Sequence, residues 1–432
     1  MANKAYAENR GNDAESSNLK LRQTTSFAAS DRTSETGKQN ASPALGRREI
    51  QRPWPHKNEP RERWMTIIPL IGIAVGLCLA GLMIWDGVQR TPYLEYCTVY
   101  NDHFSSPTLS DIWEFDISSN GFGNGEFETT TNSTDNVYIR DGMLSIEATV
   151  QDRPIVLRPP NTNITNLCPD QSSGNCFPYV NTSADIVANP IQSARIKTKL
   201  SIRYGKVEVV ARLPCGDWLW PAIWMLPTNN TYGTWPRSGE IDIVESRGNN
   251  YTYPAGGDNT MFSTLHWGPS WQYDRWDKTH GSMLAPGVPF SGGFHTFGVE
   301  WTPKHIYTYL DRRLFRVMRH NFEESMWKFG KFWQYDRPSV QLSNPWASSS
   351  SNTSPFDQDF HLILDVAVGG TNGWFWNDVA GKPWDDQATD PLAQFWEARC
   401  KWYPTWQKGH GPVMQVKSVT MWQLKDYNGC HG

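Results

Sequence analysis

The uninterrupted apolar segment Met65–Trp85 is the feature that most constrains how this 432-residue chain can fold. It holds 21 residues without a charged side chain. A helix of that length spans about 31 Å, which is enough to cross the hydrocarbon core of a bilayer. Trp64 and Trp85 stand at its two ends, where amphipathic rings prefer the membrane interface. We therefore expect one transmembrane helix that divides the chain between two compartments.

Basic residues gather on the N-terminal side of this segment. Only Arg90 is basic between Asp86 and Ser105, whereas six basic residues precede the segment, namely Arg47, Arg48, Arg52, Lys57, Arg61 and Arg63. This bias places the N-terminus in the cytosol and predicts an uncleaved signal anchor. The expected organisation is a disordered cytosolic tail over 1–63, the anchor over 64–86, a short linker over 87–97 and a folded domain over 98–432. The protein would be a single-pass type II membrane protein with its domain luminal or extracellular, in the secretory pathway or at the cell surface.

Cysteines and acceptor motifs for glycosylation support an oxidising compartment for the domain. Six cysteines follow the span, and an even number there suggests disulfides, although six cysteines allow 15 pairings. Closeness in sequence favours Cys168–Cys176, and one way to complete the set is Cys97–Cys430 with Cys215–Cys400. Asn-x-Ser/Thr motifs place N-linked glycans at Asn132, Asn163, Asn181, Asn229, Asn250 and Asn352.

From about Thr98 onward, short apolar runs alternate with turn residues, which is typical of β-strands. The clearest runs are residues 136–148, 204–213, 294–301, 306–314 and 360–369. Asp141-Gly142 and Asp311-Arg312 mark two hairpin turns. This pattern predicts one large all-β sandwich. The chain has 40 basic and 44 acidic residues, so no strongly basic domain exists and no nucleic-acid partner is expected.

Three acids stand close together in the segment SGEIDIVESRGN. On a strand, Glu240 and Asp242 point to one face, and the isoleucines that follow them point to the other face, toward the core. Strict alternation would place Val244, rather than Glu245, beside the first two acids. We therefore expect a one-residue β-bulge near residues 243–244, because bulges are frequent beside active sites.

This cluster permits acid–base chemistry. Hydrolysis of a glycosidic bond needs one carboxylic acid and one carboxylate. Crowding of like charges raises the pKa of one group, which then keeps its proton near neutral pH. Two other interpretations stay open: a solvated acidic edge strand, and a site where three carboxylates hold a hard metal cation.

Aromatic residues flank the cluster in sequence. Trp220, Trp224 and Trp235 precede it, and His266 and Trp267 follow it in STLHWG. Aromatic faces with a few placed polar groups recognise sugar rings. Trp220 and Trp224 lie on an apolar run and suit the core equally well, whereas Trp235 stands beside turn residues and is the better ligand candidate.

These motifs resemble glycoside hydrolase family 16, in its laminarinase-like branch of endo-β-1,3-glucanases. The signature E-x-D-x-x-E of that family corresponds to Glu240, Asp242 and Glu245. The likeness extends over nearly all of residues 100–430 and includes NVYIRDGMLSIEA, GDWLWPAIWMLP and FHLILDVAVGG. The chain also looks like invertebrate β-1,3-glucan recognition proteins, many of which lack the two glutamates that this chain keeps.

The resemblance implies a concave jelly-roll β-sandwich and a retaining mechanism. Glu240 would be the nucleophile, Glu245 the general acid/base and Asp242 an assisting group. Asp365 stands where relatives commonly have Asn. The substrate-binding positions that the resemblance suggests are Trp235, His266, Trp267, Trp220 and Arg195. No cofactor is required, and a structural calcium ion is allowed for, with no ligand loop to name.

Three functions remain open from the sequence. The first is hydrolysis of internal β-1,3-glucosidic bonds in a β-1,3-glucan. The second keeps the covalent intermediate but passes the glycosyl group to another glucan of a cell wall. The third is a non-catalytic β-1,3-glucan receptor, against which the intact glutamates count. The oligomeric state cannot be read from the sequence.

Overall fold

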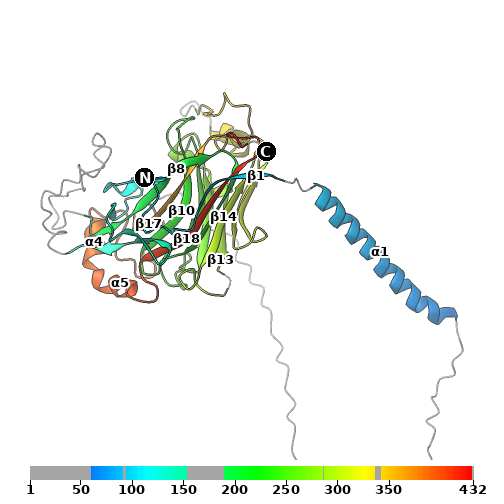
Figure 1. Cartoon of the computed structure of the whole chain (residues 1–432), viewed down its shortest axis with the longest axis horizontal. Helices are drawn as coiled ribbons and strands as arrows, with labels where there is room; N and C mark the ends of the chain where they lie inside the picture. Colours follow the sequence, from blue (N-terminus) through cyan, green and yellow to red (C-terminus); the bar gives the residue numbers. More distant parts are fainter. Residues whose placement is uncertain (1–59, 91–93, 153–188, 286, 336–341, 431–432) are drawn as a thin grey trace, which may run out of the picture. The chain divides into compact units, whose positions relative to one another are not determined.

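The computed structural model describes residues 60–90, 94–152, 189–285, 287–335 and 342–430 (Figure 1). The chain divides into two compact units, which are described separately. One unit holds the helix α1 (Pro60–Arg90). Its part Arg63–Gly87 contains an 18-residue window with a mean hydropathy of 2.6 and is, among the described helices, the one long and apolar enough to cross a membrane. Its apolar side chains are exposed, as at Leu77 and Leu79. The expected apolar helix is present. Of the tail predicted over 1–63, residues 60–63 belong to α1 and residues 1–59 lie outside the described residues.

The other unit is a β-sandwich, as expected from the sequence. Sheet I contains eight strands in the order β16-β15-β14-β9-β18-β5-β4, with β1 paired to β18. Its strands are β16 (Arg316–Asn321), β15 (His305–Leu310), β14 (His295–Trp301), β9 (Gly205–Arg212), β18 (Val413–Leu424), β5 (Met143–Glu147), β4 (Val137–Arg140) and β1 (Tyr96–Asp102). All their pairings are antiparallel.

Sheet II contains seven antiparallel strands in the order β13-β12-β11-β10-β17-β8-β2. Its strands are β13 (His280–Leu284), β12 (Thr260–His266), β11 (Glu240–Glu245), β10 (Leu219–Pro227), β17 (Phe360–Val368), β8 (Arg195–Ile202) and β2 (Trp113–Phe115). A small third sheet joins β3 (Glu128–Thr130), β7 (Ile191–Ser193) and β6 (Thr149–Val150).

Short helices lie in the connections between strands. They are η2 (Gly121–Gly123), η4 (Trp271–Tyr273), η5 (Trp276–Lys278), α3 (Met326–Phe329), η6 (Phe332–Tyr335), α4 (Pro391–Glu397) and α5 (Arg399–Trp406).

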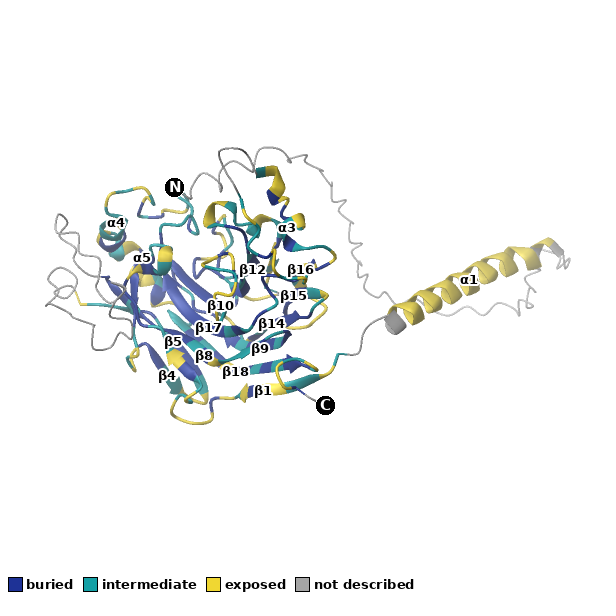
Figure 2. Ribbon diagram, turned by 90° about the horizontal axis from the view of Figure 1, so that it is seen from above, coloured by how far each residue is buried: buried dark blue, intermediate teal, exposed yellow. Residues whose placement is uncertain are grey.

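Alternation of side chains explains why these segments form a sandwich. Along β9, Val207, Val209 and Ala211 are fully buried, whereas the residues between them are partly exposed. Figure 2 shows buried residues gathered along the strands of both sheets, and one continuous apolar core joins them. The expected turn between β4 and β5 is confirmed: Asp141 and Gly142 have φ of 54° and 68°, the left-handed pair that a tight hairpin turn requires.

The disulfide predictions have mixed outcomes. Cys97 and Cys430 are bonded and tie the start of β1 to the segment after β18. The predicted pair Cys215–Cys400 is wrong, because both thiols are free. Cys215 precedes β10 and donates its S–H to the Lys408 carbonyl at 3.3 Å, whereas Cys400 is exposed on α5. The predicted pair Cys168–Cys176 lies outside the described residues.

Four of the six predicted glycan acceptors lie within the described residues. Asn132, Asn229, Asn250 and Asn352 are all exposed, so each is accessible to modification. Asn163 and Asn181 fall outside the described residues.

Candidate active site

The three acids of β11 lie on one face of sheet II because of a bulge. Along β12, Asp242 pairs with Thr264 and Glu245 pairs with Phe262, so β11 has one residue more than its partner between these two positions. The irregularity toward β10 falls at the same place. The β-bulge predicted near residues 243–244 is therefore confirmed. The intervening Ile243 and Val244 are fully buried in the core.

Glu240 begins β11 and lies beside an exposed indole. Trp235 donates its Nε1–H to Glu240 Oε2 at 2.6 Å, and 45% of the Trp235 residue surface is exposed. The Trp235 ring also lies 5.6 Å from the ring of His266. His266 lies on β12, directly opposite Glu240 on β11. The nucleophile candidate is thus fixed by a hydrogen bond, next to an aromatic surface that a sugar can contact.

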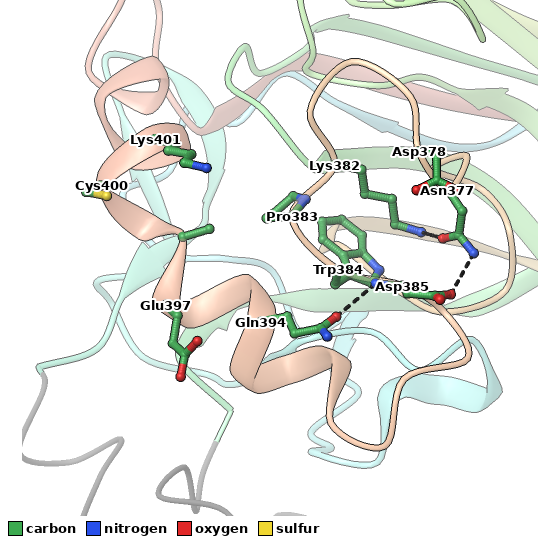
Figure 3. A pocket seen from close by; sticks show the side chains of 11 residues that line it. Asn377, Asp378, Lys382, Pro383, Trp384, Asp385, Gln394, Glu397, Cys400 and Lys401 are labelled. Carbon is green, nitrogen blue, oxygen red and sulfur yellow. Dashed lines mark hydrogen bonds between the residues drawn. The ribbon is translucent and has the colours of Figure 1, made fainter.

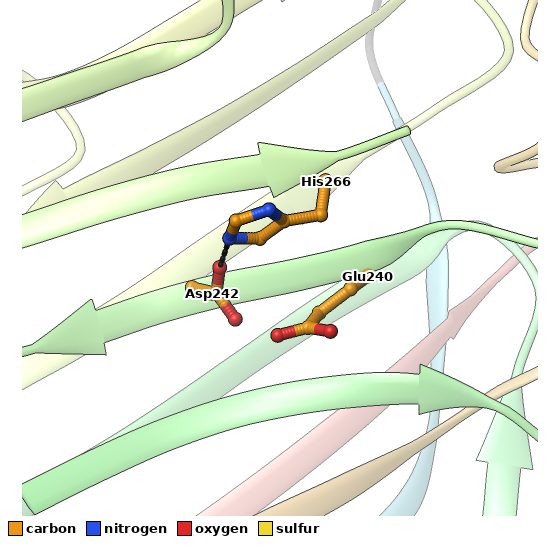
Figure 4. Close-up of side chains that lie close together, drawn as sticks. All are labelled: Glu240, Asp242 and His266. Carbon is orange, nitrogen blue, oxygen red and sulfur yellow. Dashed lines mark ion pairs between the residues drawn. The ribbon is translucent and has the colours of Figure 1, made fainter. Parts of the chain in front are cut away.

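His266 and Asp242 form a buried chain of polar contacts beside Glu240 (Figure 4). His266 Nε2 lies 3.4 Å from Asp242 Oδ2, and His266 donates Nδ1–H to Asp274 Oδ2 at 2.5 Å. Asp274 is itself held by the backbone N–H of Trp267, at 3.0 Å. Asp274 accepts the hydrogen bond from Nδ1–H, and the other ring nitrogen, Nε2, faces the acids of β11.

The electrostatics of this chain favour protons on both partners. Burial, followed by the charges of Glu240 and Glu245, raises the pKa of Asp242 well above its usual range. Burial alone would lower the pKa of His266, but Asp274 and the acids of β11 together raise it well above its usual value. Asp242 is therefore a proton carrier that can hydrogen-bond Glu240, and His266 is a partly buried imidazolium that offsets their charge.

Glu245 lies at the other end of the bulge under a stack of aromatic rings. Trp220 donates Nε1–H to Glu245 Oε1 at 3.0 Å and stacks on Trp374, with ring centroids 4.9 Å apart. The Arg247 guanidinium covers the Trp374 ring at 3.7 Å. Burial raises the pKa of Glu245 to about 7, with the charge of Glu240 adding to the effect and His266 opposing it. Glu245 thus holds a proton near neutral pH, as a general acid must.

A further carboxyl lies on the same face of sheet II, on β17. Asp365 accepts the Nε1–H of Trp224 at 2.7 Å, and burial raises its pKa to about 7. The guanidinium of Arg195 lies over the rings of Trp224 and Phe122, at 4.5 and 4.1 Å, and pairs with Asp116 at 3.4 Å. Arg195 is therefore part of this polar face, and its contact with substrate stays a prediction.

Trp267 does not lie at the site, contrary to the expectation that it contacts substrate. Its side chain is fully buried, stacks on Phe329 at 5.7 Å and donates Nε1–H to Thr279 at 2.8 Å. It comes directly after β12, which ends at His266, and it points opposite to His266, toward the core. Trp220, by contrast, is only 7% exposed but its N–H reaches Glu245, so it belongs to the site.

Two site residues had no signal in the sequence. Asp274 follows η4 in an irregular segment, and Trp374 follows β17 in a loop. Each reaches the site through chain turns that one sequence does not specify. A cluster of acids could direct attention to His266, but not to the partner of its ring.

Glu240, Asp242 and His266 could each offer one ligand atom to a metal ion, since these atoms lie within 4.8 Å of one another. Calcium prefers six to eight oxygen ligands. Two carboxylates and an imidazole nitrogen do not form such a set. These three residues therefore do not fit the hard-cation site that the sequence left open at the acids, and a structural calcium elsewhere stays a prediction.

A groove of about 520 Å³ lies elsewhere, between the loop after β17 and the helices α4 and α5 (Figure 3). None of the acids of β11 lines it. Lys382 and Trp384 line the groove, and Lys382 Nζ donates to the Phe375 carbonyl, Asn377 Oδ1 and Asp386 Oδ1 at 2.9, 2.7 and 2.5 Å. This buried ammonium already has three acceptors, so the groove is held together by an internal ion pair.

Comparison with known proteins finds one matching family and relatives that are named for binding or for hydrolysing β-1,3-glucan. The model of the family "Glycosyl hydrolases family 16" matches residues 163–360. A β-1,3-glucan-binding protein of Penaeus monodon is 38% identical over 370 residues, which cover 82% of this chain and 97% of that protein. A glucan endo-1,3-β-glucosidase of Cryptopygus antarcticus is 32% identical over 298 residues, covering 68% of this chain and 86% of that protein. The laminarinase structure from Rhodothermus marinus, 26% identical, covers 78% of this chain and all of that one with a TM-score of 0.48.

Proposed function

The chain belongs to glycosyl hydrolase family 16, and on that premise we propose that it is a retaining endo-β-1,3-glucanase. The observation that carries the proposal is the placing of two glutamates on one face of β11, one with a pKa raised by burial and the other hydrogen-bonded to an exposed indole. Glu245 has a pKa of about 7 and keeps its proton near neutral pH. Glu240 accepts the Trp235 N–H and lies partly exposed, where a sugar can reach it.

The mechanism assigns a role to each group. Glu245 donates its proton to the glycosidic oxygen as that bond breaks, and Glu240 attacks the anomeric carbon to form a glycosyl ester. Glu245, now a carboxylate, takes a proton from water, which displaces Glu240 from the same carbon. Two inversions retain the configuration. Protonated Asp242 hydrogen-bonds Glu240 and stabilises its charge as the ester forms and breaks.

Binding without turnover is a second candidate function. The relative from Penaeus monodon is named for binding β-1,3-glucan, and it matches this chain over most of its length. The two functions differ in what the acids must do, because a binding site has no need of a glutamate that keeps its proton near neutral pH. Transfer to a second glucan, instead of to water, would use the same intermediate.

The experiment uses the full chain in detergent micelles with β-1,3-gluco-oligosaccharides of defined length, and sizes the products over time. Shorter products alone would establish hydrolysis, and early products longer than the substrate would establish transfer. Glu240→Gln is the control, because it keeps the shape of the side chain and removes the nucleophile. If wild type and Glu240→Gln bind alike and neither forms products, the chain is a glucan receptor.

We also propose that α1 anchors the domain on the luminal or extracellular side. The support is the length and apolar character of α1, the bond between Cys97 and Cys430 and the exposed acceptor asparagines. Removal of N-glycans from the membrane-bound protein by an endoglycosidase should increase its mobility on a gel. A protein that leaves the membrane in alkaline carbonate, or that carries no glycan, would contradict this topology.

A further inference from the structure

Glu245 and Asp365 stand in one row across sheet II. Ala222 on β10 pairs with Glu245 on one side and with Asp365 on the other, and Arg195 on β8 continues the row beyond Asp365. Directly paired residues share a face of a sheet, so both carboxyls point the same way. Two strand spacings separate them, which is about 10 Å between backbones. At the row position between them, the side chain is a single methyl group.

The two carboxyls are held in matching ways by the strand between them. Trp220 and Trp224 flank Ala222 at two residues on either side and therefore share its face of β10. Trp220 donates its indole N–H to Glu245 at 3.0 Å, and Trp224 donates its indole N–H to Asp365 at 2.7 Å. Each indole nitrogen is thus a reporter of the charge on one carboxyl.

The charged groups that face Asp365 come from several elements. Arg195 on β8 attracts its negative form, while Glu126, before β3, and Glu245 repel it. Glu126 is buried beside Glu128, and burial raises the pKa of both. His361, on the same strand, has its pKa lowered to about 4 by burial, so it is neutral above that pH.

The charged groups that face Glu245 come mainly from β11 and β12. Glu240 raises its proton affinity, and His266 and Arg247 lower it. Asp242 is protonated beside them, since burial and the two glutamates raise its pKa. Arg195 and Arg247 therefore lie on opposite sides of the row, one toward each carboxyl.

We propose that Asp365 is a positioning residue that acts through Glu245: its negative charge holds the proton on the general acid across the open row. The catalytic consequence rests on the proposed function, whereas the coupling between the two carboxyls does not. Once one of the two has ionised, the other keeps its proton to higher pH. Asp365 thereby extends the pH range in which Glu245 can donate a proton.

The size of the effect follows from Coulomb's law. In a medium of effective dielectric constant between about 20 and 80, each of two charges about 10 Å apart shifts the titration midpoint of the other by about 0.3–1 pH unit. Loss of the charge at position 365 should lower the midpoint of Glu245 by that amount. Because coupling is reciprocal, loss of the charge at position 245 should lower the midpoint of Asp365 by the same amount.

The test uses the two indoles as probes in the full chain, in micelles, with ¹⁵N-labelled tryptophan. The N–H signals of Trp220 and Trp224 are assigned with the Phe variants and followed by NMR from pH 5 to pH 9. In Asp365→Asn, the midpoint seen by Trp220 should fall by about 0.3–1 pH unit. In Glu245→Gln, the midpoint seen by Trp224 should fall equally. Asp365→Glu, which keeps the charge, should restore the Trp220 midpoint.

The control is Glu397→Gln, which removes the same charge from an exposed site on α4 and should move neither midpoint. Unchanged midpoints in both Asp365→Asn and Glu245→Gln would overturn the proposal. The alkaline limit of kcat/KM in Asp365→Asn should move to lower pH with the Trp220 midpoint. Coupled indole midpoints in a protein without turnover would refute the proposed function and leave the coupling standing.

Discussion

The acids of β11 and the Lys382–Asp386 pair beside α4 are two sets of buried ionisable groups. They differ in the charges and the hydrogen-bond partners that surround them. Lys382 donates to three oxygen acceptors, one of which belongs to the oppositely charged Asp386. Burial lowers the pKa of Lys382, and the charge of Asp386 opposes that shift. Glu245 has other acids beside it on β11 and one indole donor, and burial raises its pKa to about 7 although His266 and Arg247 oppose that shift. A complete set of partners indicates a role in stability, whereas like charges kept together indicate chemistry.

The largest effect should come from the acids of β11. Glu240→Gln and Glu245→Gln should each lower kcat on β-1,3-gluco-oligosaccharides by about 10³-fold or more, because one removes the nucleophile and the other the proton donor. Neither should lower the melting temperature, since each relieves repulsion between like charges. Product sizing and thermal unfolding measure the two quantities. A strong loss of stability with unchanged kcat would make these acids structural.

The opposite pattern is expected at the ion pair. Lys382→Met should lower the free energy of unfolding by about 3–5 kcal/mol, because it leaves the Asp386 carboxylate buried without a partner. Denaturant unfolding measures the change. Lys401→Met is the matched control, since this lysine is exposed at the same groove. If both variants lowered the free energy of unfolding equally, burial of the ion pair would not be the cause of the loss.

The pH dependence should also separate the two places. The value of kcat/KM should fall as pH rises above about 7, where Glu245 loses the proton it must donate. The folded-state pKa of Glu245 lies above its ordinary value of 4.5, so its contribution to stability is present at low pH. That contribution, about 1–3 kcal/mol, is lost as pH rises from about 4.5 to about 7. Glu245→Gln should remove this slope, whereas Lys382→Met should retain it.

The smallest effect should come from the exposed indole. Trp235→Phe keeps an aromatic ring but removes the N–H that Glu240 accepts, and it should lower kcat by about tenfold. Steady-state kinetics separates this loss from any change in KM. Trp271→Phe is a control with an exposed indole in η4. A change confined to KM would assign Trp235 to substrate contact alone.

Local patterns predicted what depends on neighbours in sequence. The phase of three acids against two isoleucines required the bulge in β11, and Asp141-Gly142 required the turn between β4 and β5. The resemblance to relatives, rather than alternation, placed Trp267 wrongly, because it outweighed the fact that Trp267 directly follows His266 at the end of β12. Applied strictly, the period of two would have turned it toward the core.

Long-range register was beyond the sequence. The row that joins Glu245, Ala222 and Asp365 depends on how β11, β10 and β17 align, and Asp365 lies more than a hundred positions from the other two residues. The expectation that Cys215 and Cys400 pair had the same weakness, because spacing in sequence says nothing of the distance between β10 and α5. The partner of His266, Asp274, lies in an irregular segment where no periodicity applies.

In the proposed mechanism, Glu240 forms a covalent bond to the sugar and Glu245 assists it. Incubation of the full chain with a 2-deoxy-2-fluoro β-1,3-glucosyl oligosaccharide fluoride should trap the glycosyl ester, because the reagent has a good leaving group and slows hydrolysis of the ester. Peptide mass spectrometry should then find one added glycosyl group on the peptide with Glu240, and none in Glu240→Gln. A wild-type protein that binds the reagent but carries no adduct, or carries it on another residue, would contradict the account.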